Sequence, residues 1–134
     1  MGAVRLHLLN VDGRNARFLA VGSSPAWSHD GSRIAFTRNR NPRGAQSGGS
    51  GVWVVRTRGG KPAFLVWEPH QHGIALAWAR DGRLAYVVDR RLYVTRARRP
   101  AKKKLIAGRA ECCNASFEVP PAWSHDGRRL YYGT

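Results

Sequence analysis

The feature that most constrains this chain is a short segment that occurs twice and, in a shortened form, a third time. Residues 25–36 read Pro-Ala-Trp-Ser-His-Asp-Gly-Ser-Arg-Ile-Ala-Phe, and residues 121–132 read Pro-Ala-Trp-Ser-His-Asp-Gly-Arg-Arg-Leu-Tyr-Tyr. Residues 76–86 keep the pattern as Leu-Ala-Trp-Ala-Arg-Asp-Gly-Arg-Leu-Ala-Tyr. Self-similarity at an interval of about 40–50 residues is typical of proteins built from stacked structural repeats. The sequence therefore predicts a repeat protein.

Each copy predicts a β-hairpin. The Asp-Gly pair favours a tight turn, because Gly adopts positive φ readily and the Asp side chain bonds the neighbouring backbone. Large and small residues then alternate, as in Ile34, Ala35 and Phe36, which indicates a strand with one buried face and a small residue that lets another sheet approach closely. The middle copy is one residue shorter after its Gly, so we expect a tighter turn there. We interpret the following residues as structural anchors of the repeats: Trp27, Asp30, Gly31, Trp78, Asp81, Gly82, Trp123, Asp126 and Gly127.

Two further strands are predicted in each repeat, at residues 6–13 and 17–20, 52–57 and 63–66, and 92–97 and 105–107. Residues 38–51 contain no apolar side chain larger than Ala, which predicts a loop that does not pack. Residues 68–73 are expected to form a connection. Repeats of about 40–50 residues with four strands each are typical of β-propeller blades. We expect one all-β domain over residues 1–134, a partial β-propeller of about three four-stranded antiparallel blades with repeat units near 6–51, 52–91 and 92–134.

The repeat resembles the TolB-like, or WD-like, propeller repeat, in which the motif Pro-x-Trp-Ser-x-Asp-Gly-x-x-Ile-Ala-Phe precedes an aliphatic strand and a Gly-rich turn. Residues 25–36 and 121–132 match this motif, and residues 6–13 and 52–60 look like the strand and turn that follow it. Two departures occur. The usual Pro after the Ser is replaced by His29 and His125, and the middle copy has Leu76 and Ala79 in place of Pro and Ser.

The resemblance implies about half of a six-bladed propeller. Members of this family are periplasmic protein-binding modules, substrate-gating domains of prolyl-oligopeptidase-like hydrolases, or sensor domains. Three blades cannot close a ring, so two explanations stay open. The chain is a fragment of a longer propeller, or two chains pair head to tail, with the first strand of each completing the last blade of the other.

The net charge of +15, from 23 basic and 8 acidic residues, attracts polyanions such as nucleic acid. The alternative is an arginine-rich composition without a role in binding, and no recognised nucleic-acid motif is present. If a partner or polyanion binds through basic residues, two clusters are candidates. The first lies in the loop and the second around a hairpin turn: Arg38, Arg40 and Arg43; Arg98, Arg99, Lys102, Lys103 and Lys104.

Cofactor and metal sites are not predicted. His70 and His72, with Glu68 nearby, have a spacing that metal ligands use, but a third ligand is missing and a polar loop is the favoured interpretation. Cys112 and Cys113 are adjacent and are expected to remain thiols. No nucleophile elbow, paired-carboxylate motif or phosphate-binding loop is present, so no catalytic residue is predicted.

No apolar run is long enough to span a membrane, and residues 1–10 lack the pattern of a signal peptide. The chain as it stands is expected in the cytoplasm, and outside it if it belongs to a longer TolB-like protein. We expect a non-enzymatic scaffold that binds a protein or peptide partner. The alternatives are an accessory propeller of a hydrolase, and polyanion binding through the basic loops.

Overall fold

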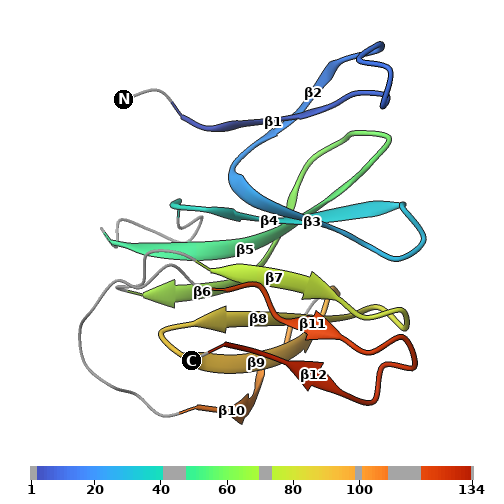
Figure 1. Cartoon of the computed structure of the whole chain (residues 1–134). Helices are drawn as coiled ribbons and strands as arrows, with labels where there is room; N and C mark the ends of the chain where they lie inside the picture. The colour runs from blue at the N-terminus through green and yellow to red at the C-terminus, as the bar shows by residue number, and fades with distance from the viewer. Residues whose placement is uncertain (1–2, 41–47, 70–73, 99–100, 109–118, 134) are drawn as a thin grey trace.

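The computed structural model describes residues 3–40, 48–69, 74–98, 101–108 and 119–133. Strands follow one another without an intervening helix in these ranges (Figure 1). Their bounds are β1 Arg5–Leu8, β2 Arg17–Val21, β3 Ser23–Trp27, β4 Arg33–Arg38, β5 Gly49–Arg56, β6 Ala63–Pro69, β7 Ala75–Trp78, β8 Arg83–Val88, β9 Arg91–Arg96, β10 Lys104–Ala107, β11 Ala122–Trp123 and β12 Leu130–Tyr131. The predicted all-β class is confirmed.

The strands form two four-stranded sheets flanked by two-stranded ones. The orders are β3-β4-β5-β6 and β7-β8-β9-β10, with β1-β2 before them and β11-β12 after them. Every pairing is antiparallel, as predicted for the four-stranded sheets. Each four-stranded sheet joins a Trp hairpin to the two strands that follow it in sequence. Figure 1 shows β1-β2 at one end of the molecule, with the four-stranded sheets following in chain order.

The hairpin turns differ by one residue, as the sequence predicts. In the first copy the backbone N–H of Ser28 donates to the carbonyl of Arg33 at 2.8 Å. In the middle copy the corresponding bond runs from Ala79 to Arg83 at 2.7 Å, so the loop it closes is shorter. The Asp-Gly pair forms the turn in both.

The core is divided between the sheets because the inner strands β4, β5 and β8 bury both of their faces. Ile34 and Phe36 on β4 pack with residues of β1-β2, whereas Ala35 points to the other side and packs with Leu84 of β8. Ala85 repeats this arrangement one sheet further on, toward β11-β12. Ala35 and Ala85 are both fully buried, so the small residue lies where the sequence predicts close approach between sheets.

The prediction of an unpacked loop over residues 38–51 is wrong at its end. Strand β5 begins at Gly49, and Ser50 is only 2% exposed. A side chain at Gly49 would lie 2.6 Å from the ring of Trp67 and 2.7 Å from the carbonyl oxygen of Glu68. Glycine packs here because it has no side chain, so the lack of large apolar residues did not mean a lack of packing. Residues 41–47 lie outside the described part.

The predicted connection at residues 68–73 also begins too early. Strand β6 continues through Glu68 to Pro69, and Glu68 is buried. Glu68 is buried because two polar groups from distant parts of the chain bind its carboxylate. No local sequence pattern indicates this pairing.

Among the described residues, no helix has the length and apolar character needed to cross a membrane.

Candidate functional site

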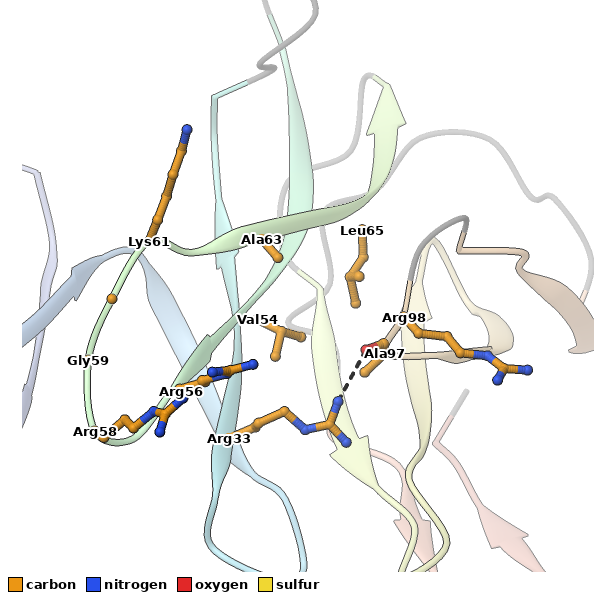
Figure 2. Close-up of a pocket in the computed structure, with 11 residues that line it drawn as sticks. Arg33, Val54, Arg56, Arg58, Gly59, Lys61, Ala63, Leu65, Ala97 and Arg98 are labelled. Atoms are coloured by element: carbon orange, nitrogen blue, oxygen red, sulfur yellow. Dashed lines mark hydrogen bonds between the residues drawn. The ribbon is translucent and has the colours of Figure 1, made fainter.

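A cleft of about 550 Å³ lies between the two four-stranded sheets, beside the turn that joins β5 to β6 (Figure 2). Val54 and Leu65 form part of its apolar floor, together with the small side chains of Ala63 and Ala97. Val54 and Leu65 are themselves buried. The volume lies in the range that pockets for small ligands or a few side chains occupy.

The polar lining of this cleft is entirely basic among the residues described. Arg33 begins β4, Arg56 ends β5, Arg58 and Lys61 flank the two glycines of the turn, and Arg98 follows β9. Arg33 and Arg56 are partners in the antiparallel register, which places them at the same end of the sheet. We call these five residues the cationic cleft set. Like charges gathered around a concave surface raise the local positive potential and favour an anion there.

Arg33 has a structural role in addition to its charge. Its Nη1 donates to the carbonyl of Ala97 at 3.1 Å, and its guanidinium carbon lies 5.0 Å from the centroid of the Trp78 ring. These contacts join β4 to the end of β7 and to the residue just after β9 in the next sheet. The Arg33 side chain is therefore fixed before any ligand arrives.

Arg56 and Arg58 are different, because their guanidinium groups have no hydrogen-bond or ion-pair partner among the described residues, and both residues are exposed. Figure 2 shows both side chains extended toward Arg33, while Lys61 and Arg98 point away at the margins of the cleft. Two unpaired guanidinium groups beside an apolar floor suit a carboxylate, which a guanidinium binds through two parallel hydrogen bonds.

The predicted basic candidates are separated by the fold. Arg38 ends β4 at the opposite end from Arg33, with its guanidinium 5.4 Å from the Trp53 ring, and Arg40 is exposed just beyond it. Arg98 joins the cleft. Lys102 and Lys104 are exposed near β10, and Arg43 and Arg99 lie outside the described residues.

Lys103 is bound within the protein rather than presented as a free cation. Its Nζ lies 2.7 Å from Oε1 of Glu68 and 4.9 Å from the Tyr93 ring centroid. The hydroxyl of the fully buried Tyr86 donates to the same Glu68 oxygen at 2.6 Å. Burial and then this hydrogen bond raise the pKa of Tyr86, so its hydroxyl stays a donor. The carboxylate thus links β6, β8 and the segment before β10.

The three repeat Trp residues occupy equivalent places. Trp78 Nε1 donates to the carbonyl of Ala26 at 2.9 Å, and Trp123 Nε1 donates to the carbonyl of Ala77 at 3.1 Å. In both cases the acceptor is the residue immediately before the Trp of the preceding repeat. Trp27 is the first of the series and is 56% exposed.

The three turn carboxylates are engaged by their own hairpins. Asp30 Oδ1 accepts from the backbone N–H and hydroxyl of Ser32 and from the hydroxyl of Ser28, which lowers its pKa to about 2. Burial opposes the shift at Asp81, but hydrogen bonds from Arg83 bring the pKa below its usual value. These carboxylates bond their own turns.

The hydroxyl of Ser124 and then the backbone N–H of Arg128 lower the pKa of Asp126 in the same way. His125 lies beside this turn, 2.9 Å from the guanidinium of Arg80. In the part of the chain that the structure describes, no group of three or more metal-binding side chains comes together. His70, His72, Cys112 and Cys113 lie outside that part.

Sequence reasoning missed four members of the cleft set: Arg33, Arg56, Arg58 and Lys61. A signal was present, because each basic residue stands next to a turn, and the turns that follow β3 and β5 lie at one end of an antiparallel sheet. The prediction instead followed the density of basic residues along the chain. No family model matches this sequence, and a search of curated proteins finds no match.

Proposed function

We propose that this chain is a non-enzymatic, TolB-like β-propeller scaffold that binds an acidic segment of a protein partner in the cationic cleft. The propeller arrangement is supported by the two equivalent Trp-to-carbonyl bonds between successive sheets. A regular repeat makes the same contact with its neighbour at each interface. The binding role rests on one observation, the unpaired guanidinium groups of Arg56 and Arg58 above an apolar floor.

The cleft favours a peptide over a nucleic acid. Proteins that bind single strands stack bases on aromatic side chains in a basic groove, and none of the described lining residues is aromatic. The apolar floor of Val54 and Leu65 suits an aliphatic side chain, and the flanking arginines suit carboxylates on either side of it. A segment that alternates Glu or Asp with Leu or Ile fits both features.

The test is a polarisation titration with a fluorescent decapeptide of alternating Glu and Leu. Its analogue with Gln in place of Glu and a single-stranded oligonucleotide of equal charge serve as comparison probes. We expect the acidic peptide to bind, the Gln analogue to bind weakly, and added salt to weaken binding.

Two double variants separate the cleft from net charge. Arg56→Gln/Arg58→Gln is expected to weaken peptide binding about tenfold or more, since charged hydrogen bonds each contribute about 1.5–3 kcal/mol. Arg14→Gln/Arg40→Gln removes the same charge from exposed positions that do not line the cleft, and should leave binding nearly unchanged. Failure of the peptide to bind at low ionic strength would refute the proposal. Equal losses in both variants, with tighter oligonucleotide binding, would assign polyanion binding instead.

A further inference from the structure

The contact between successive Trp hairpins is made twice inside the chain, each time from the same side-chain types. Arg33 lies over the Trp78 ring at 5.0 Å, and Arg83 lies over the Trp123 ring at 4.6 Å. Arg83 also donates to the carbonyl of Gly127 at 2.6 Å. With the indole bonds to Ala26 and Ala77, these contacts form a two-part connection: an Arg over the next Trp, and that Trp bonded to the preceding backbone. We call this the Trp–Arg connection.

The series has a free half-connection at each end. At the first hairpin, Trp27 has no arginine over its ring among the described residues and is 56% exposed. At the last hairpin, Arg129 holds the position of Arg33 and Arg83, and its side chain has no partner in the described ranges. Ala122, which precedes Trp123 as Ala26 precedes Trp27, is exposed. The first hairpin therefore lacks an arginine over its Trp, and the last hairpin presents an arginine that has no partner among the described residues.

The strands are incomplete in the same complementary way. In the four-stranded sheets the Trp hairpin pairs with a following two-stranded unit, through β4 with β5 and β8 with β9. Among the described residues, no following pair of strands is hydrogen-bonded to the hairpin β11-β12, and no Trp hairpin is hydrogen-bonded to the pair β1-β2. Unpaired strand edges recruit further strands.

We propose that a second copy of this chain docks head to tail, so that Arg129 and the Ala122 carbonyl of each copy complete the Trp–Arg connection at Trp27 of the other. In the closed pair, β12 of each copy pairs with β1 of the other. The occupant is a second copy because this chain itself carries both missing parts, one at each end. Two copies leave no half-connection open, which makes a discrete dimer the expected species.

The first measurement is the mass of the purified chain by light scattering after size exclusion, over a range of concentrations. We expect a dimer that dissociates on dilution. Each copy carries a net charge of +15, so repulsion opposes pairing and added salt should strengthen it. The acidic peptide of the preceding section should respond to salt in the opposite direction. A monomer at all concentrations, or an open-ended ladder of larger species, would overturn the closed pair.

The decisive test is complementation between two variants. Trp27→Ala and Arg129→Gln should each raise the dissociation constant of the dimer at least about tenfold, while each monomer keeps the wild-type circular dichroism spectrum, because both residues are exposed. A mixture of the two variants contains heterodimers in which one interface keeps both residues intact. The mixture should therefore associate at concentrations where neither variant does alone.

A labelled Trp27→Ala/Arg129→Gln double variant, mixed with the wild-type chain, is the control. In that heterodimer every interface lacks one residue, so the label should not move to the dimer position. If the two single variants fail to complement each other, or if they dimerise as well as the wild type, the head-to-tail contact is refuted. A face-to-face dimer through Trp27 of both copies would leave Arg129→Gln dimeric like the wild type while Trp27→Ala loses the dimer, and that result would also refute the head-to-tail contact.

Discussion

The Trp78 indole donates a 2.9 Å hydrogen bond to the carbonyl of Ala26, the residue next to Trp27. This bond joins two sheets whose hairpins are far apart in the sequence, and Trp123 makes the same bond to Ala77 one sheet later. The repeated Trp is thus both a packing residue and a donor that fixes the spacing between successive sheets.

Trp78→Phe removes this donor while keeping an aromatic ring. We expect the free energy of unfolding to fall by about 1–2 kcal/mol, because the Ala26 carbonyl loses its partner in a partly buried place. Trp123→Phe should lower the free energy of unfolding by a similar amount. Urea denaturation measures both. Trp27→Phe, measured in dilute solution where the chain is monomeric, should change little, and an equal loss there would show that ring size rather than the hydrogen bond is responsible.

Gly49 gives a second prediction, since a Cβ there would lie 2.6 Å from the Trp67 ring and its φ is +148°. Gly49→Ala should lower the free energy of unfolding by about 2–4 kcal/mol, from overpacking together with backbone strain. Gly13→Ala is the control, because Gly13 also has positive φ but no atom within 4 Å of the added carbon. In urea denaturation, Gly13→Ala should lower the free energy of unfolding by a smaller amount than Gly49→Ala does. Equal losses would mean that backbone strain alone, and not overpacking against the Trp67 ring, accounts for the destabilisation.

Much of the fold could be predicted because its determinants are local. The Asp-Gly turn and the alternation of Ile34, Ala35 and Phe36 are each read within a few residues, and they predict the hairpin and the direction in which each side chain points. The start of β5 could not be predicted in this way. Gly49 extends the strand because Trp67, on the next strand, fills the space beside it.

The cleft was missed for a related reason. Density along the chain favoured the basic run at residues 102–104, but folding pairs Lys103 with the buried Glu68 from another sheet. Arg56 and Arg58 are less conspicuous in the sequence, yet they remain without a partner among the described residues. Which cations stay available depends on which carboxylates the fold brings near, and that is a property of long-range packing.

The Glu68 carboxylate provides a third prediction. Its Oε1 accepts from the Tyr86 hydroxyl and pairs with Lys103, and Glu68 is only 6% exposed. Lys103→Met should lower the free energy of unfolding by about 2–3 kcal/mol, because a buried charge loses its counter-ion. Tyr86→Phe should cost about 1.5–3 kcal/mol, as expected for a hydrogen bond to a charged group.

A double-mutant cycle tests whether these two contacts act together. Since both donors bond the same oxygen, we expect the Tyr86→Phe/Lys103→Met loss to differ from the sum of the single losses by at least about 0.5 kcal/mol. Thermal and urea unfolding both give the required values. Lys104→Met removes a neighbouring exposed charge and should have little effect. Strict additivity of the two losses would contradict a shared network.

The turn carboxylate Asp30 makes the stability depend on acid pH. Hydrogen bonds from Ser32, and then from Ser28, lower its pKa from 3.8 to about 2. A lowered folded-state pKa means that the stabilisation is fully present above the unfolded pKa, near 3.8, and is lost as the pH falls through about 2. The wild type should therefore exceed Asp30→Asn in free energy of unfolding by a constant amount above about pH 5, and the difference should shrink toward about pH 2. Urea denaturation at a series of pH values measures this difference, and an NMR titration of the Asp30 carboxyl locates its midpoint. A midpoint near the ordinary value, or a difference that does not change with pH, would contradict the role of these hydrogen bonds.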